Sequence, residues 1–163
     1  LGRGAGITVL IIDACKGFVA VTFLAGFVIA NADGISAQLL RIILGLACIC
    51  GHNWTVFLNF KGGKGVATTL GVLLGFAFNI AGLKFVVFSA VLTWCLLFFI
   101  TSIISLASIV TAAALPIYMV IFKQSLTMIS LGLLLSLFVI LRHKSNLMRL
   151  LQGKEPRLQF RKK

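Results

Sequence analysis

Acidic residues are scarce in this sequence. Asp and Glu together account for three of 163 residues, whereas Lys and Arg account for 15, so the formal net charge is +12. Charged residues make up 11% of the chain and hydrophobic residues 60%, while soluble domains are roughly 25% charged and 45–50% apolar. This composition excludes an ordinary soluble domain and indicates a membrane protein that crosses the bilayer several times.

Cysteine is present, but not in a pattern that builds a disulfide or metal framework. The four cysteines, Cys15, Cys48, Cys50 and Cys95, all lie within apolar segments. A disulfide framework needs exposed, paired cysteines, and a zinc site needs better-spaced ligands. We therefore predict packing roles for these residues, and neither a metal site nor a cofactor.

The basic residues follow membrane topology rather than the pattern of a nucleic-acid-binding surface. They lie at the ends of apolar segments and in the C-terminal tail, as the positive-inside rule describes. We expect no nucleic-acid partner. The chain opens on Leu1 and shows no signal-peptide pattern, and we expect it to be a fragment that lacks its N-terminus.

Six apolar segments predict transmembrane helices, since a span requires about 20 predominantly apolar residues. They are residues 7–30, 35–50, 66–81, 84–100, 109–122 and 126–141. We therefore expect an all-α polytopic membrane protein, with residues 1–163 in a single domain. A hydroxyl-rich joint, residues 101–108, precedes the fifth span, and Pro116 is expected to kink that span.

The distribution of Lys and Arg predicts that both ends of the chain face the cytoplasm. The cytoplasmic side then holds Arg3, Lys61, Lys64, Arg142 and the tail. The opposite side holds Lys84 and Lys123. The loop before the third span, the joint at residues 101–108, the start of the first span and the tail would all reach the cytoplasmic face. This predicts a site at that membrane interface rather than a pore.

A polar loop, GHNWTVFLNFKGGKG at residues 51–65, separates the second and third spans. Its glycines allow backbone N–H groups to point inward, and Lys61 and Lys64 supply positive charge, which together suit a phosphate-type anion. The helix expected to begin at Val66 would direct its positive end to the same place. A nucleotide-binding P-loop is excluded, because Lys64 is followed by Gly65 and not by Ser or Thr. The alternative is a flexible basic loop that faces anionic lipid.

Two further groups of polar residues interrupt apolar sequence. Asp13 and Lys16 are three residues apart in the first span, so they share a helix face and can neutralise each other. A structural ion pair and a direct catalytic role both fit this spacing. Ser105 and Ser108 lie in the hydroxyl-rich joint, where serine hydroxyls are expected to bond back to their own helical turn.

The C-terminal segment, residues 143–163, is predicted to be a basic cytoplasmic tail. Leu147, Leu150 and Leu151 give it an apolar side, so an interfacial amphipathic helix is expected, with its basic end on anionic lipid. His143 lies where the last span meets water, and it is either a structural residue or a proton carrier or phosphate donor. Glu155 is expected to tether an Arg or Lys.

Three of these stretches together resemble one family, the bacterial acyl-phosphate:glycerol-3-phosphate acyltransferases (PlsY). They are GHNWTVFLNFKGGKGVATTLG at residues 51–71, DACKG at residues 13–17 and HKSNLMRLLQGKE at residues 143–155. The resemblance runs along essentially the whole chain. It departs from the family pattern at Thr55, where Pro is common, and the family's first span and its S-G-N-x-G-A-T-N-x-x-R loop should precede Leu1.

The resemblance implies transfer of a fatty acyl group from acyl phosphate to the 1-hydroxyl of sn-glycerol 3-phosphate. The products are lysophosphatidic acid and phosphate, at the first step of bacterial phospholipid synthesis. It also implies a seven-span protein of the bacterial inner membrane, with its active site facing the cytoplasm. A functional link to the enzyme that forms acyl phosphate follows, with anionic membrane lipid as a further partner.

The resemblance also assigns site residues. It implies His143 and Asn146 as catalytic, Glu155 as supporting, and as substrate-binding His52, Asn53, Gly62, Gly63, Lys64, Gly65 and Arg149. From the loop and the joint themselves we add Lys61, Ser105 and Ser108 as predicted substrate-binding residues, and from their spacing Asp13 and Lys16 as supporting residues. An acyl phosphate is an activated mixed anhydride, so no Ser or Cys nucleophile is required. The base is either His143 or a phosphate oxygen of a bound substrate.

The alternative functions are a small membrane transporter for a phosphorylated anion and a structural membrane subunit, although the sequence contains no internal repeat of the kind transporters show.

Overall fold

The computed structural model describes residues 3–31, 34, 36–60 and 62–158. Every regular element in this part of the chain is helical, which confirms the predicted all-α fold. The chain divides into two compact units, Leu1–Lys84 and Phe85–Lys163. The expectation of a single domain stays a prediction.

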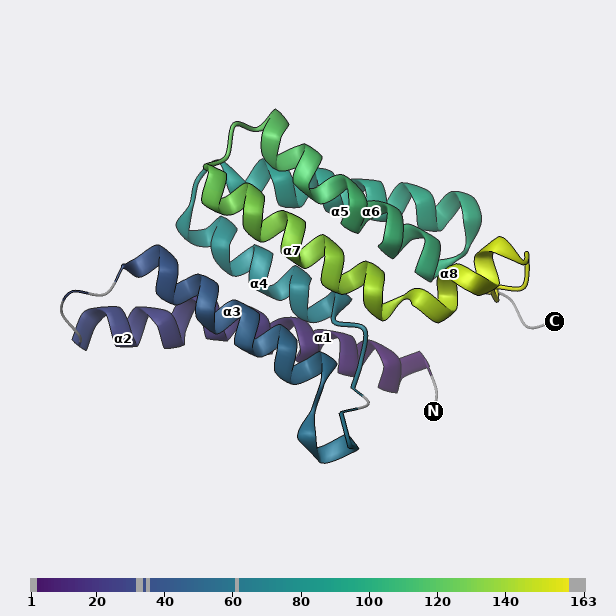
Figure 1. Cartoon of the computed structure of the whole chain (residues 1–163), viewed down its shortest axis with the longest axis horizontal. Coiled ribbons are helices and arrows are strands. Elements are labelled where there is room, and N and C mark those ends of the chain that lie inside the picture. Colours follow the sequence, from purple (N-terminus) through teal and green to yellow (C-terminus); the bar gives the residue numbers. More distant parts are fainter. Residues whose placement is uncertain (1–2, 32–33, 35, 61, 159–163) are drawn as a thin grey trace. The chain divides into compact units, whose positions relative to one another are not determined.

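The first unit is built from a long N-terminal helix and two shorter helices beside it (Figure 1). Its elements are α1 (Arg3–Val19), the π-helical turn η1 (Ala20–Leu24), α2 (Ala25–Asn31), α3 (Ala37–Asn53), the short 3-10 helix η2 (Val56–Leu58) and α4 (Val66–Asn79). In Figure 1, α3 runs alongside α1 and α2, and the loop from α3 to α4 projects at one end of the unit. That loop is the polar stretch singled out in the sequence.

Glycines allow α1 and α4 to pack with their backbones close together. A Cβ on Gly17 of α1 would lie 2.5 Å from the carbonyl oxygen of Thr68, and a Cβ on Gly71 of α4 would collide with the carbonyl oxygen of Ala14. Small residues at such crossings are typical of helices packed within membranes. The crossing fixes which part of α1 lies beside the start of α4, and this part carries Asp13 and Lys16.

The π-helical turn η1 widens the long helix where it meets α3 and α4. Its Val21 is fully buried. A Cβ added to Gly45 of α3 would lie 3.2 Å from the Val21 side chain, and a Cβ added to Gly75 of α4 would lie 3.0 Å from it. π-Turns within α-helices are rare and often occur at functional sites. Here the turn seats one valine against two glycines and so locks the three helices in register.

The described part of the second unit is built from four helices, which can be followed in Figure 1. They are α5 (Leu83–Thr101, which begins two residues before the boundary between the units), α6 (Ile104–Ile121), α7 (Leu126–Arg142) and α8 (Lys144–Leu151). α6 packs along α7, where Met119 fills the space above Gly132. Hydrogen bonds join α5 to α6, from Trp94 Nε1 to Ser108 Oγ at 3.0 Å and between the Thr93 and Tyr118 hydroxyls at 2.6 Å.

The six predicted spans correspond to six long helical stretches, the first of them running through α1, η1 and α2. In the described part of the chain, three stretches are long and apolar enough to cross a bilayer: Gly4–Asn31, Leu83–Thr101 and Ile104–Ile121. The pair α7 and α8, bent by 64°, makes a fourth, and α3 and α4 are shorter apolar helices. About six transmembrane helices is consistent with this arrangement.

The fifth span starts earlier than the sequence suggested. α6 begins at Ile104, so the hydroxyl-rich joint shrinks to Ser102 and Ile103, with Ser102 in a left-handed conformation (φ 57°). Ser105 and Ser108 therefore belong to the first turns of a helix and not to a loop. Pro116 lies inside α6, and the helix continues beyond it to Ile121.

Candidate active site

The loop between α3 and α4 is held against the end of α3 by its own backbone. The Gly63 N–H donates to the carbonyl oxygen of His52 at 3.1 Å. Asn59 and Phe60 both have positive φ, at 48° and 61°, a conformation that non-glycine residues seldom adopt. Gly65, with φ 73°, then caps α4, which begins at Val66. Lys61, a predicted binding residue, lies outside the described residues.

Three glycines make this close approach possible. A Cβ on Gly62 would collide with the carbonyl oxygen of His52, and one on Gly63 would collide with the imidazole Nε2 of His52. A Cβ on Gly65 would lie 2.5 Å from Asn53 Oδ1. The structure thus brings His52 and Asn53 together with Gly62, Gly63 and Gly65, and the predicted binding role of these residues stays a prediction. Lys64 lies in the same loop and is exposed.

Buried polar atoms without partners gather at this loop. Asn53 is 1% exposed, and neither its Oδ1 nor its Nδ2 has a hydrogen-bond partner among the residues that the structure describes. The hydroxyls of Thr68 and Thr69, in the first turn of α4, are also buried and unpaired. No side chain caps the N-terminus of α4. Buried polar atoms are nearly always satisfied, so this cluster has the donors and acceptors that a polar ligand would use.

Asp13 and Lys16 form the ion pair predicted from their spacing, and the pair extends to His52. Lys16 Nζ lies 2.7 Å from Asp13 Oδ1 and 2.8 Å from His52 Nδ1, while His52 Nδ1 lies 3.4 Å from Asp13 Oδ1. The link from α1 to the end of α3 spans 36 residues of sequence. Sequence spacing identified the pair but gave no signal for its third member.

In the second unit, Glu155 connects α6, α8 and the segment that follows α8. Its Oε1 accepts hydrogen bonds from Ser105 Oγ at 2.6 Å and from Asn146 Nδ2 at 2.5 Å, and its Oε2 accepts one from Arg149 Nε at 2.7 Å. The expected tether to a basic residue is therefore present. The carboxylate side chain is 6% exposed.

The environment of Glu155 favours its ionised form. Burial alone would raise the pKa of this carboxyl group. The hydrogen bonds from Ser105, Asn146 and Arg149, together with the positive charge of Arg149, outweigh burial and lower the pKa from 4.5 to about 2. Glu155 is therefore a carboxylate at neutral pH, which makes it an acceptor for these three residues.

His143 lies at the bend between α7 and α8. The sequence placed this residue where the last span meets water, yet it is 2% exposed, because the ring turns back toward the last turn of α7. Its Nδ1 lies 2.8 Å from the carbonyl oxygen of Val139. A carbonyl only accepts, so Nδ1 carries a proton in this arrangement. Asn146, one turn further, is 4% exposed, and its Oδ1 has no hydrogen-bond partner within residues 3–31, 34, 36–60 and 62–158.

The two serines of the joint behave differently. Ser108 Oγ donates to the carbonyl oxygen of Ile104 at 2.9 Å, as expected for a helical serine, and also accepts from Trp94. Ser105 instead donates to Glu155. The chain after Glu155 is attached to the joint as well, through a hydrogen bond of 2.8 Å from the Leu158 N–H to the Ser102 carbonyl oxygen. Sequence analysis did not predict the hydrogen bond from Trp94 to Ser108.

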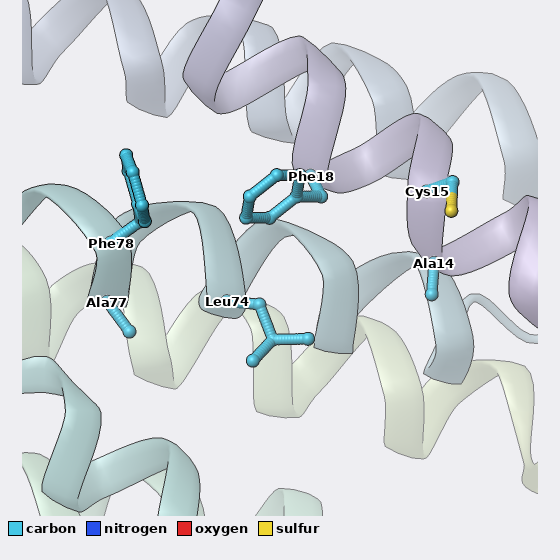
Figure 2. Close-up of a pocket in the computed structure, with 6 residues that line it drawn as sticks. All are labelled: Ala14, Cys15, Phe18, Leu74, Ala77 and Phe78. Carbon is cyan, nitrogen blue, oxygen red and sulfur yellow. The ribbon is translucent and has the colours of Figure 1, made fainter.

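An apolar groove of about 460 Å³ lies between α1 and α4 in the first unit. It is lined by Ala14, Cys15, Phe18, Leu74, Ala77 and Phe78. Figure 2 shows the side chains of the first three residues coming from one helix and those of the other three from the second. The groove contains none of the polar residues described above, so it belongs to the apolar surface of the unit.

The chain matches the family model described as "Glycerol-3-phosphate acyltransferase" over residues 1–153. The glycerol-3-phosphate acyltransferases of Gloeobacter violaceus and Parasynechococcus marenigrum are each 39% identical to it over 158 residues, covering 97% of this chain and 73% and 68% of theirs. That of Fusobacterium nucleatum is 37% identical over 160 residues, covering 98% of this chain and 76% of its own.

Two crystal structures of PlsY, an integral membrane glycerol 3-phosphate acyltransferase, are similar to this chain at 31% identity. The glycerol 3-phosphate form has a TM-score of 0.79 and aligns with 98% of this chain and 74% of that one. The lysophosphatidic acid form has a TM-score of 0.78, with 97% and 74% aligned. From the family model, these relatives and the shared structure, the chain is a membrane protein that belongs to the glycerol-3-phosphate acyltransferase (PlsY) family.

Proposed function

We propose that this protein transfers a fatty acyl group from acyl phosphate to the 1-hydroxyl of sn-glycerol 3-phosphate, giving lysophosphatidic acid and inorganic phosphate. It does so in the bacterial inner membrane, with its active site facing the cytoplasm, as the first step of phospholipid synthesis. One observation carries the proposal: beside the glycine loop and the N-terminus of α4, the buried amide of Asn53 has no hydrogen-bond partner in the described part of the chain, and no described side chain caps that helix. Such a cradle of donors suits a phosphate group.

The loop residues are assigned to glycerol 3-phosphate. The backbone N–H of Gly65 and those of the first turn of α4 approach the phosphate, which is where the helix dipole favours negative charge. Asn53 has both a donor and an acceptor to offer, so it can bond a phosphate oxygen or a glycerol hydroxyl. Lys64, and Lys61 by its place in the sequence, supply the positive charge that a dianion requires.

The reaction needs positioning more than activation, since the acyl phosphate already carries a good leaving group. The 1-hydroxyl oxygen attacks the acyl carbonyl carbon, the bond from that carbon to the phosphate oxygen breaks, and the hydroxyl proton passes to a base. Basic residues and N–H donors stabilise the charge that develops on the departing phosphate. The products are the ester and inorganic phosphate.

The base that accepts the hydroxyl proton is either His143 or a phosphate oxygen of a bound substrate. In the neutral ring of His143, Nδ1 carries the proton and Nε2 is the basic atom, so this side chain has a site that accepts a proton. However, Nδ1 bonds a main-chain carbonyl rather than a carboxylate, and Glu155 is bonded to Ser105, Asn146 and Arg149. A phosphate oxygen of a bound substrate is therefore the favoured base, with His143 and Asn146 as the proposed catalytic residues that orient the reacting groups.

The test uses membranes that contain the full-length protein as it is encoded. Labelled glycerol 3-phosphate is supplied with palmitoyl phosphate or, separately, with palmitoyl-CoA, and labelled lysophosphatidic acid is measured. We expect product from acyl phosphate alone, and a loss of about 10-fold or more in kcat/KM on Lys64→Ala, because hydrogen bonds to charged groups contribute roughly 1.5–3 kcal/mol.

Lys84→Ala is the matched control, because it removes an exposed lysine that is predicted to face the other side of the membrane. It should leave kcat/KM near the wild-type value. Product from palmitoyl-CoA alone would overturn the assigned donor. Absence of product from either donor, with glycerol 3-phosphate instead crossing sealed vesicles, would favour transport over acyl transfer.

A further inference from the structure

Lys16 lies between a carboxylate and an imidazole. Its Nζ is 2.7 Å from Asp13 Oδ1 and 2.8 Å from His52 Nδ1, both within hydrogen-bond distance. The side chains of Asp13 and His52 are 19% and 15% exposed, and that of Lys16 is 39% exposed. Asp13 thus holds the ammonium group, and the ammonium group also contacts the imidazole, so that the three polar atoms form a compact triangle.

The chemistry of these groups determines the state of His52. An ammonium group has three N–H donors and no acceptor, so its partner atom must accept. Nδ1 of His52 therefore carries no proton, and the neutral ring carries its proton on Nε2. The competing arrangement would place a proton on Nδ1 and direct it to Asp13 Oδ1, but that distance is 3.4 Å. Lys16 holds the closer position and excludes it.

The opposite edge of the ring faces the glycine loop. Outside Gly63 and its two chain neighbours, Nε2 is the heavy atom nearest to the position of a Cβ on Gly63, followed by Cε1 and Cδ2 of the same ring. The tautomer that Lys16 imposes therefore places the N–H of the imidazole at Gly63, in the segment assigned to the phosphate. The other tautomer would present a lone pair there, which repels an anion.

We propose that Lys16, held by Asp13, is a positioning residue for His52: it fixes the neutral tautomer that carries its proton on Nε2, so that an N–H donor faces the phosphate loop at Gly63. The inference rests on the proposed function, since the benefit of this donor is the binding of the glycerol 3-phosphate phosphate group. It gives Asp13 and Lys16 a role in substrate binding that goes beyond a structural ion pair.

The first test reads the tautomer directly and needs no enzyme activity. The full-length protein carrying ¹⁵N-histidine is placed in nanodiscs, and its imidazole nitrogens are observed by NMR at pH 7.5. The chain has two histidines, His52 and His143, so a His52→Gln spectrum assigns the signals. We expect the wild type to show a protonated Nε2 and an unprotonated Nδ1 at His52. Lys16→Met should shift His52 toward the other tautomer or the cation, and Lys16→Arg should retain the wild-type state.

The second test separates positioning from simple structural support. Lys16→Met should raise KM for glycerol 3-phosphate by roughly 10- to 100-fold, the range expected for one hydrogen bond to a charged group, with a much smaller change in kcat. Lys16→Arg should recover most of the loss, and Lys84→Met serves as the control. In a His52→Gln background, Lys16→Met should add little, because the two changes act through one interaction.

The outcomes distinguish this inference from the proposed function. A wild-type His52 protonated on Nδ1, or a tautomer unchanged in Lys16→Met, would overturn the positioning role whatever the activity. Additive losses from Lys16→Met and His52→Gln would do the same. Conversely, the expected NMR result in a protein that transfers no acyl group would preserve the tautomer assignment and reject the proposed reaction.

Discussion

At the scale of single residues, Glu155 is the one acid in the sequence of the second unit, and it joins three polar side chains. It receives hydrogen bonds from Ser105 on α6, and from Asn146 and Arg149 on α8. Removing one partner of a buried charged network leaves the others unsatisfied, which costs more than the bond itself contributes. Glu155 therefore holds Asn146, a proposed catalytic residue, in a fixed orientation against the start of α6.

We predict that Glu155→Gln lowers the free energy of unfolding by about 1.5–3 kcal/mol at pH 7, the range for a hydrogen bond to a charged group. The pKa of this carboxyl group falls from 4.5 in its ordinary state to about 2 in the folded protein. Its stabilising contribution is therefore complete above pH 4.5 and is lost as the pH falls through 2.

Urea titrations in detergent micelles, followed by circular dichroism at several pH values, measure this difference. The gap between wild type and Glu155→Gln should be constant from pH 7 to about pH 5 and shrink toward pH 2. Lys154→Gln, which changes an exposed neighbour, is the control and should show no such dependence. A gap that stays constant to pH 2 would contradict the ionised network.

At the scale of helices, the crossing of α1 and α4 carries the first unit. The two backbones approach closely: a Cβ added to Gly17 would lie 2.5 Å from the carbonyl oxygen of Thr68 and 2.9 Å from the backbone nitrogen of Val72. A side chain at either crossing glycine would separate the helices and move Asp13 and Lys16 away from His52. Stability of the unit and geometry of the phosphate loop are therefore coupled through this crossing.

We predict that Gly71→Ala lowers the free energy of unfolding by about 1–3 kcal/mol, because overpacking a tight site forces backbone shifts. The added Cβ would meet the carbonyl oxygen of Ala14, and backbone cannot rotate away as a flexible side chain can. Thermal unfolding of the purified protein in one detergent measures the change. Gly26→Ala, on α2 with open space around the added Cβ, should be neutral or slightly stabilising. Equal effects of the two changes would refute a tight crossing.

Helices were the most predictable level of this structure, because long apolar runs bounded by Gly, Asn and Lys define their ends. The sequence predicts too late a start for α6, because Ser105 and Ser108 resemble part of a polar loop. In the structure both residues are helical: Ser105 donates to Glu155, and Ser108 donates to the carbonyl oxygen of Ile104. The π-helical turn η1 had no signal either, because its residues Ala20–Leu24 form an ordinary apolar run. Its cause is tertiary: Val21 must fit against Gly45 and Gly75.

At the scale of the whole molecule, sequence analysis proposed site residues but did not predict how distant ones meet. The string from Gly62 to Gly65 predicted a phosphate loop from local chemistry alone. The bonds of Lys16 to His52 and of Ser105 to Glu155 join residues 36 and 50 positions apart, and no spacing rule links such pairs. Only the packing of helices within each unit brings them together.

Topology is the remaining prediction at this scale, and the distribution of Lys and Arg carries it. Lys64 and Lys123 are both exposed, and the positive-inside rule puts the first in the cytoplasm and the second outside. In a background with the four native cysteines replaced, Lys64→Cys and Lys123→Cys are labelled with a membrane-impermeant maleimide on spheroplasts of a bacterium that expresses the protein. We expect labelling at position 123 only, and labelling at position 64 only after the membrane is opened.

The reverse pattern would place the phosphate loop outside the cell, away from the compartment in which phosphorylated metabolites such as glycerol 3-phosphate are held. The acyltransferase proposal would then fail on supply of its substrate, even with every residue of the loop in place. Labelling at both positions in intact spheroplasts would instead indicate a mixed orientation. The excess of 15 Lys and Arg over three acids argues against that outcome, because a strong positive bias selects one orientation.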